Sequence, residues 1–215
     1  QMALNGVYDP RPYREKILRL FGVPSCSFFS VWGDHTEDGR QLASRVLDFT
    51  SDIGLGTIPL ITVYVPDGGA AHVSIGYVGM MSVLAGMNEH GVAISAVGSG
   101  SSLDRLHTES ISVKAREVLE HAANLDEGLP MLTGSADDGI VRAPSVGTVA
   151  MLTWGDPAGA GANAQAGVTE FNGVFASLNR YGPAGDCEEE AWLYEFDHAG
   201  NLANTYNHLD HPMQA

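Results

Sequence analysis

Strand-like segments on both sides of a single helical block constrain the fold of this chain more than any other feature of its sequence. Short apolar and β-branched stretches separated by turns fill residues 26–98 and 145–207. Between them, the segment after Thr108 carries apolar residues at helical spacing. A parallel doubly wound sheet needs strands and helices in alternation, whereas this order is typical of antiparallel sheets covered by helices. The sequence therefore predicts an α+β fold in one domain over residues 1–215.

Individual elements are expected from periodicity and from turn residues. A helix is predicted over residues 11–21, ended by Gly22. Strands are predicted at 26–33, 41–49, 58–66, 72–79, 91–98 and 145–155, over 164–179 with a turn at Asn172-Gly173, and at 190–207. Two further helices are predicted, a longer one containing Val113, Ala115, Val118, Leu119 and Ala122, and a shorter one with Leu125, Leu129 and Leu132.

The composition and net charge indicate which classes of binding partner to expect. The formal net charge is -15, and the only lysines are Lys16 and Lys114. Such a surface repels phosphate backbones and anionic lipids, so we expect neither nucleic-acid binding nor membrane docking. No apolar run approaches the roughly 20 residues of a membrane span. The chain begins at Gln1 instead of Met, so we expect missing upstream residues, and cytoplasmic and secreted locations both stay open.

Three motifs that suggest cofactor, metal or serine chemistry are set aside. "GAGANA" (159–164) lacks the last glycine of a dinucleotide loop. "HLDHP" (208–212) has two histidines but no evident third ligand for zinc. "GSGSSLD" (98–104) is serine-rich without a histidine in register and without a G-x-S-x-G elbow. We therefore expect no cofactor and no metal.

Cys26 is the residue best suited to catalytic chemistry, and two interpretations of its role are possible. Free cysteine is commonly a small buried apolar group, which favours a packing role. However, Cys26 opens a predicted strand, which places its sulfur at a sheet edge beside a loop. A bridge to Cys187, the other cysteine, is not expected, because a chain of 215 residues does not need a disulfide.

Arg45 and Asp48 lie in the strand predicted to pair with that of Cys26. A guanidinium beside the thiol favours the thiolate, and a carboxylate can orient a neighbouring amine. No histidine is well placed as a base. If the Ser25–Cys26 bond were cut, the new α-amino group, with a pKa of about 8, could accept the thiol proton. Nucleophile and base would then belong to one residue.

The segments CSFFSVWG (26–33), EDGR (37–40) and RVLDF (45–49) resemble the start of the mature chain of N-terminal-nucleophile hydrolases. The similar branch is the acyl-CoA:6-aminopenicillanic-acid acyltransferase-like group. The segment YVGMMSVLAGMNEHGVAIS (77–95) resembles a second block of that branch and of choloylglycine hydrolases. The resemblance implies an αββα sandwich of two antiparallel sheets covered by helices.

The resemblance also implies a reaction and its residues. It implies autocatalytic cleavage before Cys26, with residues 1–25 as propeptide and 26–215 as mature chain, and amide hydrolysis or acyl transfer through a thioester. The implied substrate is a small acyl amide or acyl-CoA. Cys26 is then nucleophile and base, Arg45 and Asp48 orient the amine and substrate, Asn88 lies beside the site, and Asn179 or Asn207 donates to the oxyanion.

Two departures from the family pattern support a rival hypothesis. Ser25 precedes Cys26 where relatives commonly have glycine, and Val46 follows Arg45 where they have asparagine. The chain is also shorter than most relatives, which is compatible with a fragment of a longer protein. The alternative is a non-catalytic structural or assembly subunit that keeps the fold with Cys26 merely packed. A homo-oligomer is compatible with either hypothesis.

Overall fold

The computed structural model describes residues 26–33, 36–47, 54–98, 110–133, 148–155, 157, 164–171, 176–181 and 191–195. Within these residues the chain forms ten strands and two α-helices. The strands are β1 (Cys26–Gly33), β2 (Gly39–Leu47), β3 (Pro59–Tyr64), β4 (His72–Tyr77), β5 (Ala85–Asn88), β6 (Val92–Gly98), β7 (Thr148–Trp154), β8 (Gln165–Phe171), β9 (Ala176–Tyr181) and β10 (Ala191–Glu195). The helices are α2 (Ile111–His121) and α3 (Leu125–Thr133), and a 3-10 turn covers Leu55–Thr57.

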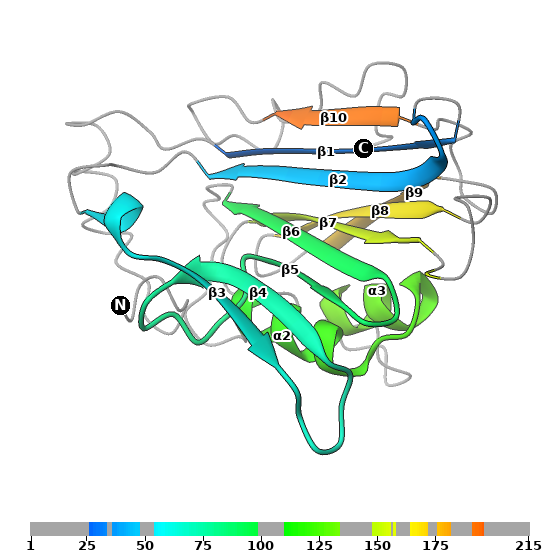
Figure 1. Cartoon of the computed structure of the whole chain (residues 1–215). Coiled ribbons are helices and arrows are strands. Elements are labelled where there is room, and N and C mark those ends of the chain that lie inside the picture. The colour runs from blue at the N-terminus through cyan, green and yellow to red at the C-terminus, as the bar shows by residue number, and fades with distance from the viewer. Residues whose placement is uncertain are drawn as a thin grey trace.

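The strands form two sheets whose described pairings are all antiparallel. The smaller sheet has the order β10-β1-β2, and the larger has the order β3-β4-β5-β6-β7-β8-β9. Figure 1 shows the smaller sheet lying over the larger one, with α2 and α3 on the opposite side of the larger sheet. This layering confirms the predicted α+β class and its antiparallel sheets.

A helix-facing core fills the space between the seven-stranded sheet and the two helices. Its members alternate along β6, where Val92, Ile94 and Ala96 face the helices. The helical contribution comes from Ala115, Val118, Leu119, Leu125, Leu129 and Leu132, which are all nearly fully buried. The apolar residues predicted at helical spacing are thus buried, except Val113, which is 49% exposed.

Both helices begin at polar side chains that satisfy backbone donors. The Ser110 side chain accepts from the Ser112 backbone N–H at 3.3 Å. The Asn124 side chain accepts from the Glu127 N–H at 3.0 Å, and the Glu127 carboxylate accepts from the Ala123 N–H at 2.8 Å. These reciprocal bonds fix the turn between α2 and α3. None of the helices that the structure describes is long and apolar enough to cross a membrane.

A second core lies between the two sheets. Val97 of β6 and Met151 of β7 pack there with Phe28 and Trp32 of β1. Because strand residues alternate between faces, Val97 points to the smaller sheet while its neighbour Ala96 points to the helices. We call this side of the seven-stranded sheet its inner face.

Strand β5 was not predicted from the sequence. It is four residues long and pairs with both β4 and β6. A Cβ atom at Gly86 would lie 2.4 Å from the Val73 carbonyl oxygen and 2.6 Å from a Leu119 methyl carbon. Glycine therefore lets α2 approach the sheet at this strand, and its low strand propensity hid the strand from sequence analysis.

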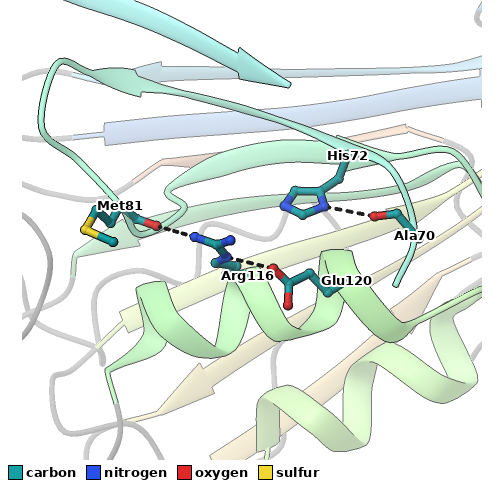
Figure 2. Close-up of polar contacts among 5 residues, drawn as sticks. All are labelled: Ala70, His72, Met81, Arg116 and Glu120. Carbon is teal, nitrogen blue, oxygen red and sulfur yellow. Dashed lines mark hydrogen bonds and ion pairs between the residues drawn. The ribbon is translucent and has the colours of Figure 1, made fainter. Parts of the chain in front are cut away.

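The β3–β4 hairpin is fastened to α2 through its helix-facing side. Arg116 of α2 lies over the Tyr64 ring at 4.4 Å, and the Tyr64 ring stacks on His72. Figure 2 shows Arg116 donating to the Glu120 carboxylate and to the Met81 carbonyl, at 2.8 and 3.3 Å. In the same view, Nδ1 of His72 lies 3.0 Å from the Ala70 carbonyl. These described contacts hold the hairpin through its helix-facing side.

The remaining predicted elements agree with the structure to within a few residues or fall outside it. Strand β1 has the predicted bounds, whereas β3 and β4 each end two residues early. The predicted strand at 164–179 is two strands, β8 and β9, as its central turn indicated. The predicted helix at 11–21 and the end of the predicted strand at 190–207 lie outside the described residues.

Candidate active site

Cys26 is the first residue of β1, and strand alternation places it on the side that faces the inter-sheet core. Phe28 and Trp32, two and six residues further on, are 1% and 3% exposed within that core. Cys26 itself is only partly buried and packs against the margin of the same core. Its thiol therefore lies at the boundary between the packed interior and the end of the strand.

Arg45 connects the two sheets at this boundary. It lies in β2, two residues before Leu47, whose register partner is Cys26. Its Nε donates to the carbonyl oxygen of Ala96 in β6 at 2.9 Å. Its Nη2 lies 3.8 Å from the Cys26 sulfur. The guanidinium is thus held by the larger sheet while it faces the thiol of the smaller one.

The charge of Arg45 is poorly compensated by its described neighbours. Burial lowers the pKa of the guanidinium, while its electrostatic interactions with Cys26 and then Tyr77 raise that pKa. Within the described residues, no carboxylate forms an ion pair with Arg45. A partly buried cation without an anionic partner among the described residues attracts negative charge, and the Cys26 sulfur lies 3.8 Å from it. The arrangement therefore favours the thiolate form of Cys26.

Gln41 is a second inter-sheet contact that the sequence analysis missed. Its side-chain amide donates to the Ser30 hydroxyl at 3.1 Å and to the Gln165 carbonyl at 3.0 Å. Gln41 and Arg45 are four residues apart in β2, so they point to the same side of the strand. Two polar side chains at inward-facing positions of one predicted strand are unusual, and this pattern could have identified Gln41 as an inter-sheet contact together with Arg45.

Tyr77, also missed, extends the site onto the inner face of the larger sheet. It ends β4, and its phenol is close enough to influence the pKa of Arg45. Ile75, two residues earlier in β4, shares its face and is 54% exposed. Met87 of β5 is exposed on that same face, because its register partner is Val73. An uncharged apolar surface therefore continues from the Cys26–Arg45 pair.

Asn88 does not lie beside Cys26, and this prediction is wrong. Its side-chain amide donates to the carbonyls of Leu119 and Ala122, at 3.2 and 2.7 Å. Its oxygen accepts from the backbone N–H groups of His90 and Val92, at 3.1 and 3.0 Å. Asn88 is buried on the helix-facing side, whereas Cys26 faces the inner side. All its hydrogen-bonding capacity closes the β5–β6 turn onto the end of α2.

The other predicted site residues are less completely placed. Asp48 and Asn207 lie outside the described residues, as does Cys187. The backbone of Asn179 belongs to β9, where its register partner is Val168 of β8. The structure therefore brings together Cys26 and Arg45, and the roles of Asp48, Asn179 and Asn207 stay predictions. Within the described ranges, no group of three or more His, Cys, Asp or Glu residues could hold a metal ion.

Comparison with known proteins places the fold. No family model and no curated protein sequence matches the chain. A solved structure of a Caenorhabditis elegans N-acylethanolamine-hydrolyzing acid amidase ortholog is similar, with a TM-score of 0.52 at 14% identity. The match covers 73% of this chain and 64% of that one. Penicillin V acylase from Agrobacterium tumefaciens gives a TM-score of 0.47 at 18% identity, over 72% of this chain and 49% of that one.

These similarities concern the fold. The chain spans about two thirds of the length of the amidase ortholog and half that of the acylase. Together with the two antiparallel sheets and the helices on the larger one, the likeness to the amidase ortholog identifies an α+β sandwich like that of the N-terminal-nucleophile hydrolases. The predicted fold is confirmed.

Proposed function

We propose that this protein is a cysteine amidohydrolase or acyltransferase that cleaves a linear amide through a thioester on Cys26. The observation that carries the proposal is the 3.8 Å contact between the Cys26 sulfur and a guanidinium without a described carboxylate partner. A purely structural thiol gains little from such a neighbour, whereas a nucleophilic thiolate is stabilised by it. The similarity to an amide-hydrolysing enzyme supports the same reaction class.

The proposed reaction begins with cleavage of the Ser25–Cys26 peptide bond by the protein itself. The freed α-amino group of Cys26 takes the thiol proton, and the thiolate attacks the substrate carbonyl to form a C–S bond. The C–N bond then breaks, and the amine leaves with the proton from the Cys26 ammonium group. Water or an acceptor amine finally attacks the thioester and restores the thiol.

The other predicted residues take supporting roles in this proposal. Asp48 follows Leu47, the register partner of Cys26, and would orient the Cys26 amine. Asn179 or Asn207 would donate to the oxyanion, a contact that is typically worth roughly 2.7–4 kcal/mol in such reactions. Arg45 would hold the thiolate and the negative charge that develops on the substrate.

The acyl portion of the substrate is proposed to be apolar. Tyr77 connects Arg45 to the exposed inner-face side chains Ile75 and Met87, which are apolar. An acyl group bound at Cys26 would lie against this surface. Replacing Ile75 with aspartate, at a half-exposed position that tolerates the change, should raise KM for apolar acyl amides at least about tenfold. Val113→Asp, at a similarly exposed position on α2, is the control and should leave KM unchanged.

The decisive experiment is the N-terminal sequence and intact mass of the purified active protein. A mature terminus at Cys26 is expected, together with loss of activity and of cleavage in Cys26→Ala. Incubation with a slowly hydrolysed acyl amide should add the mass of the acyl group at Cys26. An intact Ser25–Cys26 bond in active protein would overturn the proposed mechanism.

The rival hypothesis of a non-catalytic subunit makes the opposite prediction for thiol chemistry. Cys26 packs against the inter-sheet core, and this is the observation in its favour. A packed structural thiol should react slowly with iodoacetamide in the folded state. Fast alkylation near neutral pH is expected if Cys26 is the nucleophile.

A further inference from the structure

Strands β3 to β5 form a region that is almost free of charge. Between Ile53 and Asn88 the only charged residue is Asp67, although the chain as a whole is 17% charged. At that average, about six charged residues would be expected in this stretch. In a protein with a net charge of -15, this is a surface on which a second acidic chain would meet little repulsion.

The same region holds most of the exposed apolar side chains. Of the thirteen large apolar side chains exposed in the described residues, nine lie here: Ile58, Leu60, Ile61, Val63, Val65, Ile75, Val78, Met81 and Met87. Three of them follow one another on alternate positions of β3 and the residue after it: Ile61, Val63 and Val65 are 67%, 69% and 78% exposed. A contiguous exposed apolar surface of this kind marks an interaction site.

Strand β3 is also the edge of the seven-stranded sheet, and its free side can be identified. The Val78 N–H donates to the Ile58 carbonyl at 3.1 Å, and Pro59 faces Tyr77 in the register. The even-numbered residues of β3 therefore direct their N–H and C=O groups to β4. The odd-numbered residues Ile61 and Val63 direct theirs outward, where no described strand pairs with them.

This free edge is self-complementary. If two β3 strands pair antiparallel about a two-fold axis at Thr62, Ile61 of one copy lies opposite Val63 of the other. Both residues present outward N–H and C=O groups, so each of the two equivalent pairs exchanges two hydrogen bonds. The opposed Ile61 and Val63 side chains lie on the same face and cover one another. Position 59 also directs its backbone groups outward. The missing N–H of Pro59 therefore removes no hydrogen bond to β4.

We propose that the protein forms a two-fold dimer in which β3 of one copy pairs with β3 of a second copy. Natural proteins protect free strand edges with charges, prolines, bulges or covering segments, and of these the described residues of β3 show only Pro59, at the first position and outside the proposed Ile61–Val63 pairs. The hairpin is held from its helix-facing side by Arg116 on Tyr64, and no described strand pairs with its outer edge. Pairing joins the sheets of the two copies into one and is independent of the proposed catalytic function.

The proposed register can be tested with double variants that place opposite or like charges at positions 61 and 63, which face each other across the dimer. In Ile61→Lys/Val63→Glu, lysine lies opposite glutamate in both pairs of the dimer, so dimerisation should persist. In Ile61→Lys/Val63→Lys, two like-charged pairs face each other, and the Kd of the dimer should rise about tenfold or more. Light scattering during gel filtration should report about twice the 22.7 kDa of one uncleaved chain for the wild type and for the Lys/Glu variant.

A second pair of variants tests the backbone bonds themselves. Val63→Pro removes an N–H that points outward, so the fold should survive while the dimer dissociates. Val63→Thr keeps the N–H and the branched shape and should remain dimeric. A monomeric wild type at all concentrations, as expected if another segment or partner covers β3, would refute the proposal. So would equal dimerisation of the Lys/Lys and Lys/Glu variants.

Discussion

Replacing Arg45 with methionine tests the link between the structure and the proposed chemistry. The change removes a charge that lies 3.8 Å from the Cys26 sulfur and keeps a side chain of similar length. Two unit charges at this distance attract by about 4 kcal/mol at an effective dielectric constant of about 20, and by about 1 kcal/mol in bulk water. Because Cys26 is partly exposed, the loss should fall between these limits.

These limits translate into a rate that can be measured. A loss of 1 to 4 kcal/mol lowers the thiolate fraction roughly 5-fold to 1,000-fold at a pH below the titration of the thiol. A more basic thiolate is intrinsically more nucleophilic, with a Brønsted coefficient of about 0.4–0.5, so roughly half of the effect is recovered on a logarithmic scale. Alkylation of Arg45→Met by iodoacetamide at pH 7 should therefore be roughly 2-fold to 30-fold slower than in the wild type.

The design includes two further variants. Arg45→Lys keeps the charge but cannot reach the Ala96 carbonyl and the sulfur with one rigid fork, so its rate should be intermediate. Arg40→Met removes an arginine from the same strand, where the side chain is 72% exposed and pairs with Asp38, and should leave the rate unchanged. Equal alkylation rates in folded wild type and Arg45→Met would show that the guanidinium does not stabilise the thiolate.

Three further predictions concern stability and can be checked by urea denaturation. Asn88→Ala should lower the free energy of unfolding by roughly 3–5 kcal/mol, because buried carbonyl and N–H groups lose their partners. The alkylation rate of Cys26 in the folded variant should equal that of the wild type. A slower alkylation would show that Asn88 does act at the Cys26 site. Gly86→Ala should cost roughly 1–3 kcal/mol, since its Cβ collides with the Val73 carbonyl, and a neutral change would show that the strand can move aside. Gln41→Ala should cost roughly 1–3 kcal/mol by leaving the Gln165 carbonyl without its donor, and an unchanged midpoint would argue against this contact.

The sequence was sufficient for features that depend on local alternation. The bounds of β1 followed from an aromatic and β-branched run that ends at a turn, and Arg45 followed from a strand that returns antiparallel to it. The buried faces of α2 and α3 followed from helical spacing. In each case the residues that decide the outcome are close together in the sequence, so that neighbouring side chains reveal the period.

The sequence alone could not predict on which face of a sheet the residues of a short strand place their side chains. Asn88 was expected beside Cys26 because its segment resembled a family block. Its orientation depends on the register of β5, a four-residue strand containing Gly86 that shows no periodicity of its own. Tyr77 influences Arg45 because the two sheets pack together and Arg45 of β2 reaches the Ala96 carbonyl of β6, although three strands separate β2 from β6 in the sequence. Such contacts arise from the tertiary fold.

A packed thiol and a reactive thiol at position 26 differ in whether they account for the neighbouring Arg45. A packing role explains why the sulfur contacts the inter-sheet core, but it does not explain Arg45. Partly burying a guanidinium costs free energy, which a hydrogen bond to one carbonyl and a contact with a neutral thiol offset only in part, and no carboxylate among the described residues pairs with it. A fold under selection for stability alone could place an apolar residue at position 45 and fill the same space. A thiolate or an oxyanion beside the guanidinium would supply a counter-charge, so the placement of Arg45 is understandable if negative charge forms at Cys26 during the proposed reaction.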